Sequence, residues 1–133
     1  RMTKEAKFIE YDFTIYPFKL WIGVGGTLNC VKEGFVNIDG NELTFTDKEE
    51  NYSLGITMDV MRRETRDYGV LVYFSSKERM TTKVIAHEAT HAARRLFEHI
   101  NADIENEEPF AYAVGFIAEC CDEVKKRKFK KEK

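Results

Sequence analysis

Two histidines and a glutamate form the pattern H-E-x-x-H in the stretch VIAHEATHAARRLF, as His87, Glu88 and His91. Helix residues four apart lie on one face, so both histidines can direct ring nitrogens at one ion about 2.0–2.1 Å away. Glu88 lies about 100° further round, which suits a base that takes a proton from a zinc-bound water. The pattern predicts one Zn²⁺ per chain, with Glu88 as the catalytic base.

A catalytic zinc site takes a third protein ligand and leaves its fourth position open. His99 would lie about 80° off the line of the two histidines and is a poor ligand. The acidic residues Glu105, Glu107 and Glu108 are the alternative, since they stand at the start of the next expected helix. A carboxylate from this group reaches the histidines if the two helices pack together.

The simpler interpretation is that a short motif has arisen by chance on an ordinary helix. The histidine face, however, lies roughly opposite the apolar residues Ile85, Ala89, Ala92 and Leu96. Small residues around the histidines let neighbouring elements approach the helix on both sides. A buried helix that carries polar histidines needs partners for them, and a metal is one such partner. We therefore favour the metal site.

The first half of the chain has the pattern of strands. Apolar residues alternate with polar ones in two runs, Ile9, Tyr11, Phe13, Ile15 and then Phe18, Leu20, Ile22, Val24. Each run would lie on one face of a sheet, and Pro17 between them indicates an edge, a bend or a break. Two further strands are expected between Thr57 and Phe74, around the turn RRETRD, with a helix over Met58–Thr65 as the alternative.

Residues 27–56 carry weaker signals. Leu43 and Phe45 have the spacing of a short strand, after turn residues at Asp39-Gly40-Asn41. The GVGG segment that ends at Gly26 lacks the Lys-Ser/Thr ending of a phosphate-binding loop, and no helix pattern follows it directly.

The second half changes to a helical period. Ile85, Ala89, Ala92, Leu96 and Ile100 fit one helix face, which Thr81 or Thr82 can cap. After a loop at 101–106, a second helix is expected from about Glu107 to Val124. Strands followed by helices predict an α+β fold, in which a mostly antiparallel N-terminal sheet precedes two packed helices that carry the metal site.

HEATH at 87–91, a connecting loop and EPFAYAVG at 108–115 together resemble the gluzincin class of zinc metallopeptidases. The chain is most similar to the minimal, single-domain zincin-like proteins found in phages and prophages. The resemblance covers the two helices, about 45 of the 133 residues. As given, the chain has no counterpart of the C-terminal helical domain of larger gluzincins.

The resemblance implies that Glu108, ahead of Glu107, is the third zinc ligand. Pro109 belongs in the first helical turn, so it would fix Glu108 rigidly at the helix start. Tyr112 shares the face of Glu108 and is expected either to donate to the oxyanion or to pack over the ligands. Glu119, two turns further on, either orients a ligating histidine or is a solvated acid.

The composition suits one domain over residues 1–124 and a basic tail over Lys125–Lys133, which has seven basic residues and one acidic residue. We expect this tail to be a solvated helix end, and binding of nucleic acid is the less favoured alternative. The three cysteines show no C-x-x-C pattern, so they are expected to be core thiols in a reducing compartment.

No apolar run is long enough to cross a bilayer, and no secretion signal precedes the first strand. The expected location is therefore the cytoplasm of a bacterial or phage-infected cell. The function predicted is a zinc-dependent metallopeptidase that binds a peptide or protein substrate along a sheet edge. The alternative is a catalytically silent metal-binding module that acts by contacting a protein or nucleic acid.

Overall fold

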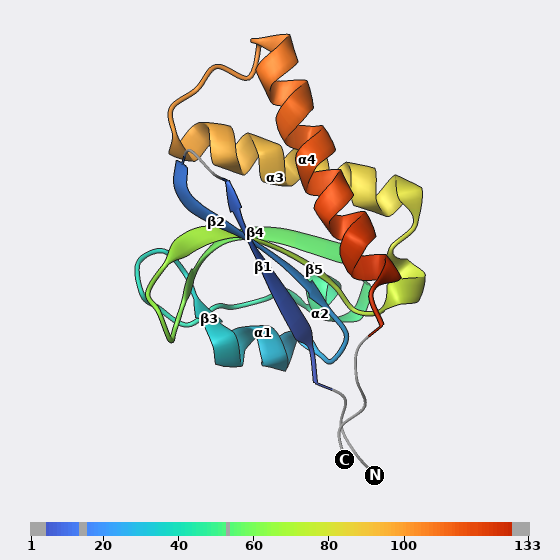
Figure 1. Ribbon diagram of the computed structural model, residues 1–133. Helices are drawn as coiled ribbons and strands as arrows, with labels where there is room; N and C mark the ends of the chain where they lie inside the picture. Colours follow the sequence, from blue (N-terminus) through green and yellow to red (C-terminus); the bar gives the residue numbers. More distant parts are fainter. Residues whose placement is uncertain (1–4, 14–15, 53, 129–133) are drawn as a thin grey trace.

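The sheet comes from the first half of the chain and two long helices from the second, which confirms the α+β fold (Figure 1). The computed structural model describes residues 5–13, 16–52 and 54–128. Ile15, which was assigned to the first strand, lies outside the described residues. The elements are β1 (Lys7–Phe13), β2 (Tyr16–Val24), α1 (Leu28–Gly34), β3 (Phe35–Val36), α2 (Asp47–Tyr52), β4 (Gly55–Arg62), β5 (Tyr68–Phe74), a 3₁₀ turn (Lys77–Arg79), α3 (Thr82–His99) and α4 (Glu107–Lys126).

The strands are arranged in the order β1-β2-β5-β4-β3. β1 with β2, β4 with β5 and β3 with β4 are antiparallel pairs, whereas β2 and β5 are parallel. The mostly antiparallel sheet is therefore confirmed. β5 lies near the middle and is buried from Gly69 to Phe74, as expected for an apolar strand that is covered on both faces.

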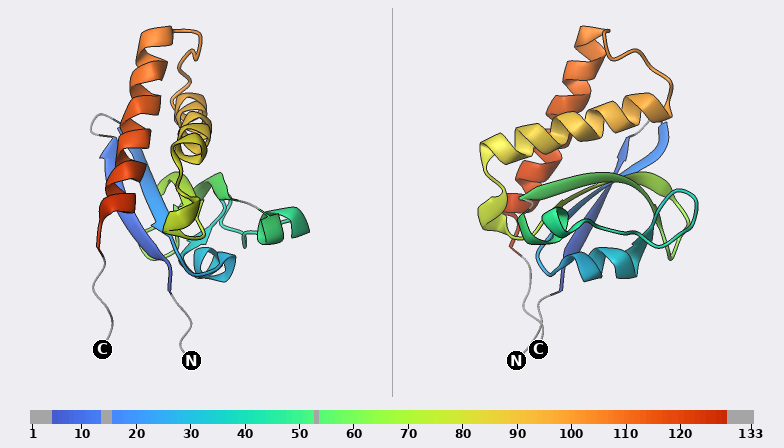
Figure 2. Two further views of the ribbon diagram at one scale, coloured as in Figure 1. Left: turned by 90° about the vertical axis from the view of Figure 1, so that its right-hand side faces the viewer. Right: turned by 180° about the vertical axis from the view of Figure 1, so that it is seen from behind.

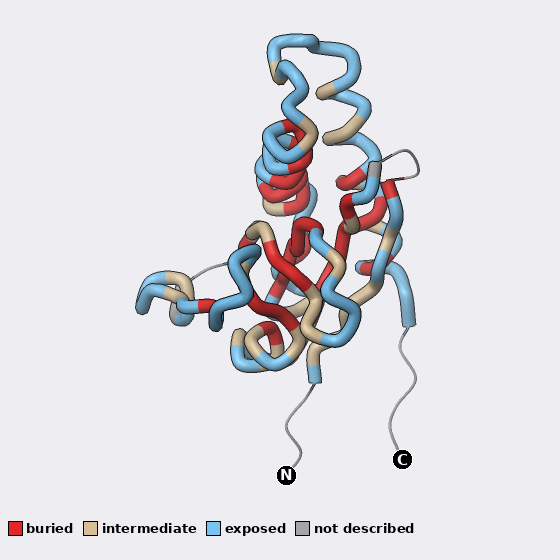
Figure 3. Tube along the Cα trace, turned by 90° about the vertical axis from the view of Figure 1, so that its left-hand side faces the viewer, coloured by how far each residue is buried: buried red, intermediate tan, exposed pale blue. Residues whose placement is uncertain are grey.

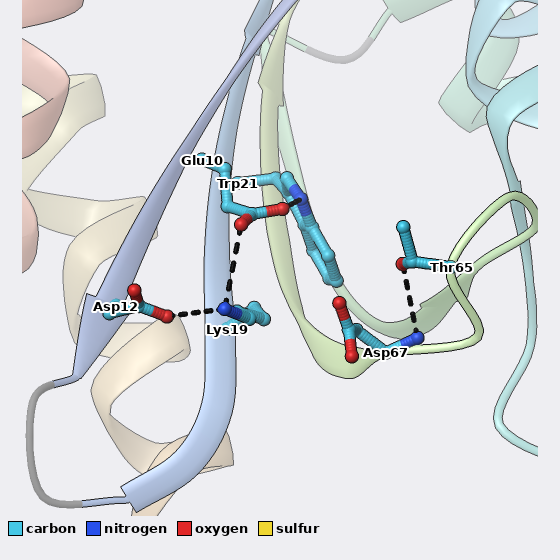
Figure 4. Close-up of polar contacts among 6 residues, drawn as sticks. All are labelled: Glu10, Asp12, Lys19, Trp21, Thr65 and Asp67. Carbon is cyan, nitrogen blue, oxygen red and sulfur yellow. Dashed lines mark hydrogen bonds and ion pairs between the residues drawn. The ribbon is translucent and has the colours of Figure 1, made fainter.

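Cross-strand polar contacts fix the register of β1 on β2 (Figure 4). Glu10 lies opposite Trp21 and accepts a hydrogen bond from the indole nitrogen at 3.0 Å. Asp12 lies opposite Lys19 and accepts from its ammonium group at 2.5 Å. Because side chains alternate along a strand, a slip of one residue would lose both contacts.

The sheet separates two apolar clusters. α3 and α4 cover one face and α1 lies on the other (Figures 1 and 2). The helical side buries Leu20, Ile22, Val72 and Phe74 with residues of α3 and α4, among them Ala89, Ala92, Leu96, Ile117 and Cys121. The α1 side buries Trp21, Val31, Phe35, Leu43, Val60, Leu71 and Tyr73. The alanines of α3 let the helix lie close to the sheet.

Both long helices occur where the apolar period predicts them. Thr81 caps α3, and its hydroxyl oxygen accepts from the backbone N–H of Val84 at 3.2 Å. Loop 101–106 and the start of α4 are exposed at one end of the molecule (Figure 3).

Two details of the middle region differ from expectation, and a third decides between the two predictions for residues 58–65. α1 begins at Leu28, directly after the glycine turn, where no helix was predicted. This helix has seven residues and one buried side chain, Val31, so it shows no apolar period. Leu43 and Phe45 form no strand but pack on the α1 side of the sheet. Residues 58–65 form part of β4 and a turn, so the alternative helix there is wrong.

Candidate metal centre

His87 and His91 lie side by side on the exposed face of α3. Their Nε2 atoms are 3.2 Å apart, and the ring centroids are 4.7 Å apart in an edge-on arrangement. Two nitrogens bound tetrahedrally to one zinc ion would be about 3.3–3.4 Å apart, given bonds of about 2.0–2.1 Å. The pair therefore has the spacing of two ligands of one ion. The same distance suits a hydrogen bond in which one ring donates to the other.

The histidines are exposed, whereas the sequence predicted a buried helix whose histidines need partners. Ile85, Ala89, Ala92 and Leu96 are buried, whereas the histidines face solvent. Water can satisfy their ring nitrogens, so burial does not force a metal partner on them. The case for a metal rests instead on the helical spacing and on the short distance between the two nitrogens.

Glu88 is the one charged side chain that is buried among the described residues, with 6% of its surface exposed. The Thr57 hydroxyl of β4 donates to Glu88 Oε1 at 2.5 Å. The missing side chain of Gly55 leaves space for the Glu88 side chain, because a Cβ added at Gly55 would lie 3.0 Å from Glu88 Cγ and 3.2 Å from the ring of Phe74. One strand thus supplies a hydroxyl partner and the gap into which Glu88 fits.

Two of the three cysteines belong to the core on the helical side of the sheet. Cys120 and Cys121 are buried there, as predicted, whereas Cys30 on α1 is only partly buried. Burial, and then the neighbouring charges of Cys120 and Glu88, raise the pKa of Cys121 to about 12. A thiol must lose its proton to bind zinc, so this environment disfavours Cys121 as a ligand.

β4 has an open edge beside α3. β3 pairs only with Arg62 and Met61, so no described strand pairs with Gly55–Val60 on that side. The Arg62 N–H donates to the Asp67 carbonyl at 2.9 Å, which makes these two residues a hydrogen-bonded pair. Hydrogen-bonded and non-hydrogen-bonded pairs alternate along two antiparallel strands. Gly55, Thr57 and Asp59 therefore direct their N–H and C=O groups away from β5, toward the open edge.

Asp59 and Arg95 form a second contact between this strand and α3. Arg95 lies one turn after His91, and its Nη1 is 3.5 Å from Asp59 Oδ2. Asp59 Oδ1 is buried and has no hydrogen-bond partner among the residues that the structure describes. Burial raises the pKa of Asp59, and Arg95 opposes that shift. Thr57 and Asp59 were not predicted as part of the site, although their spacing of two within a strand places them on a common face.

Glu108 lies apart from the histidine pair. It is exposed in the first turn of α4, two residues before Phe110, whose ring contacts that of Phe97 with 5.3 Å between centroids. Phe97, the residue of α3 that the start of α4 contacts, lies about 9 Å beyond His91 along the helix axis and about 120° around it. The start of α4 therefore packs against a different part of α3 from the one that carries the histidines. Among the described residues, no three His, Cys, Asp or Glu side chains come together as a metal site. The structure assembles the two histidines and does not add Glu108.

The other candidate residues are exposed as well. Tyr112 has 76% of its surface exposed, and Glu105, Glu107 and Glu119 also face solvent. His99 is exposed and stacks on Phe18 with 4.1 Å between the ring centroids.

Comparison of the chain with protein-family models, with curated proteins and with solved structures gave no match. None of the helices described is both long and apolar enough to span a bilayer.

Proposed function

We propose that the chain is a zinc-dependent metallopeptidase in which His87 and His91 hold the metal and Glu88 is the general base. The 3.2 Å separation of the two Nε2 atoms carries this proposal. A bound zinc ion would polarise the scissile carbonyl and make the attacking water more acidic.

Glu88 accepts the proton of the attacking water and passes it to the leaving amine. Its carboxylate is held by Thr57 and has little freedom to turn away. Gly55, Thr57 and Asp59 offer outward backbone groups beside this carboxylate, so an extended peptide can add to β4 as a further strand. The substrate backbone then lies beside the histidine pair.

Glu108 remains the proposed third ligand because of the resemblance alone. It would bind only if the start of α4 moved toward His87 and His91 when the metal arrived. Tyr112 shares its face of α4 and would move with it, which would allow its hydroxyl to donate to the substrate oxyanion.

The proposal is tested with zinc-loaded protein and a library of quenched fluorescent peptides. We expect cleavage that a chelator stops and that added zinc restores. The Glu88→Gln variant should keep its zinc and lose cleavage, whereas Glu98→Gln, an exposed acid on the same helix, should retain both. Equal activity of Glu88→Gln and the unaltered chain would contradict the assignment of the base.

A second candidate is a metal-binding module without catalysis. It is favoured by the presence of two, and not three, assembled ligands among the described residues. A partner protein or nucleic acid would then supply the missing contacts, with Lys125–Lys133 as the expected docking segment. A salt-sensitive affinity for DNA that deletion of this segment abolishes, together with zinc binding but no hydrolysis, would support it.

A further inference from the structure

A cavity of about 450 Å³ lies beneath the open end of β4, on the α1 side of the sheet. Its lining comes from four elements of the chain. These residues include Leu28 and Lys32 of α1, Glu49 and Glu50 of α2, Ile56 of β4 and Tyr73 of β5. Figure 2 shows α2 projecting sideways from the body of the molecule, so its acidic residues form an outlying wall.

A peptide added to β4 would send every second side chain toward this cavity. Thr57 and Asp59 face α3, as their contacts with Glu88 and Arg95 establish. Ile56 and Met58 therefore face the α1 side, where Ile56 lines the cavity and Met58 packs against the apolar cluster. Directly opposed residues of paired strands share a face. The peptide residue opposite Ile56 thus points at the cavity, and its neighbours point at α3.

The cavity combines apolar walls with an acidic rim. Leu28, Ile56 and Tyr73 offer apolar surface. The Tyr73 hydroxyl donates to the Gly25 carbonyl at 2.7 Å, and burial raises its pKa to about 12, so it carries no charge at neutral pH.

The charges on the rim favour a cation. Glu49 and Glu50 outnumber Lys32, whose ammonium lies 5.8 Å from the centre of the Phe45 ring. Glu49 lines the cavity and accepts a hydrogen bond from the Thr46 N–H at 2.8 Å. A long side chain with an apolar stem and a positive end matches both features.

We propose that this cavity selects a lysine or arginine side chain of the peptide bound to β4. The stem lies along Leu28, Ile56 and Tyr73, and the cationic end meets Glu49 and Glu50. The inference rests on the proposed binding of a peptide to the open edge. It does not depend on zinc or on hydrolysis, so it is testable on the metal-free protein.

The test is an NMR titration of the ¹⁵N-labelled full chain with blocked pentapeptides Val-Ala-X-Ala-Val, in which X is arginine, norleucine or glutamate. We expect amide shifts at Gly55–Asp59 and Leu28 that saturate, with arginine binding about tenfold more tightly than norleucine and glutamate binding most weakly. Equal affinities for the three peptides, shifts that miss β4, or no binding would each overturn the proposal.

A double variant isolates the acidic rim. Glu49→Gln with Glu50→Gln should reduce the preference for arginine over norleucine to about twofold or less, because neutral glutamine side chains cannot form charge-assisted hydrogen bonds with the guanidinium as carboxylates do. Glutamine still serves at the third position of a helix capping box, so α2 keeps its start. Glu105→Gln with Glu107→Gln removes the same charge elsewhere and should leave the preference intact. Selective binding without any zinc-dependent cleavage would contradict the proposed peptidase activity and support the selectivity of the cavity. Cleavage without a preference for arginine would support the peptidase and contradict the selectivity of the cavity.

Discussion

The contact of α3 with β4 and the corner between α3 and α4 differ in how fully their polar groups are assembled. Along β4, Thr57 holds Glu88 at 2.5 Å and Gly55 leaves space for it. At the corner, Glu108 and Tyr112 are exposed. The first region needs only helical spacing and one adjacent strand, whereas the second needs a long loop to place α4 correctly. Glu88 is therefore held between a helix and a strand that pack directly against each other, whereas Glu108 and Tyr112 lie on an exposed side of α4.

The largest expected effect is on the β4 side. Glu88→Gln should lower kcat/KM for peptide hydrolysis by about 10²–10⁴, since it removes a general base while glutamine keeps the shape. Zinc content should stay the same as in the unaltered chain. Steady-state kinetics and elemental analysis on the same sample check both. Loss of zinc along with activity would place Glu88 among the ligands instead.

Substitution of Glu108 tests whether the start of α4 contributes to the metal site. If the start of α4 joins the site when zinc binds, Glu108→Ala should weaken zinc affinity by about 10–100-fold or more, as expected for a lost ligand or its support. Glu105→Ala and Glu107→Ala should change it little. Competition with a zinc-binding dye measures all three. An unchanged affinity for Glu108→Ala would leave the corner outside the metal site, and release of the metal by Glu107→Ala would shift the register of α4.

Gly55 on β4 and Gly115 on α4 allow the packing of the two regions to be compared through the free energy of unfolding. Gly55→Ala should lower the free energy of unfolding by about 1–3 kcal/mol, because its methyl group would press on Glu88 and Phe74 in a packed region. The methyl group of Gly115→Ala on α4 meets no described residue within 4 Å, so this change should raise stability by about 0.5–1 kcal/mol through helix propensity. Urea unfolding of both variants checks the signs. Equal effects would mean that β4 does not crowd Glu88.

The smallest effect concerns Asp59, whose pKa is raised by burial. A carboxyl group with a raised pKa in the folded state favours folding while it is protonated, and that contribution is lost as pH rises through the folded pKa. The Asp59→Asn variant should therefore gain stability relative to the unaltered chain as pH increases from acid to neutral. Chemical unfolding at a series of pH values checks this. A difference that stays constant with pH would show that Asp59 titrates alike in both states.

The sequence predicted the elements with a strong period. Alternation placed β1 and β2, the charged turn RRETRD between two strand segments placed β4 and β5, and the spacing from Ile85 to Ile100 placed α3 with the histidines on one face. It missed α1, whose seven residues bury one side chain. It also missed the pairing of Thr57 with Glu88, which are 31 residues apart. The order of strands in a sheet is a non-local property, so no local pattern shows that Gly55–Val60 form an open edge.

The central claim is that His87 and His91 hold one zinc ion, and the most direct test is the zinc content of the untagged chain. Protein loaded with zinc and then desalted without chelator should contain one zinc per chain by elemental analysis. His87→Ala should fall well below one, since a single remaining histidine cannot retain the ion. His99→Ala, which removes a histidine from the same helix, should keep the full content. Well under one zinc in the unaltered chain, or full zinc in His87→Ala, would contradict the account.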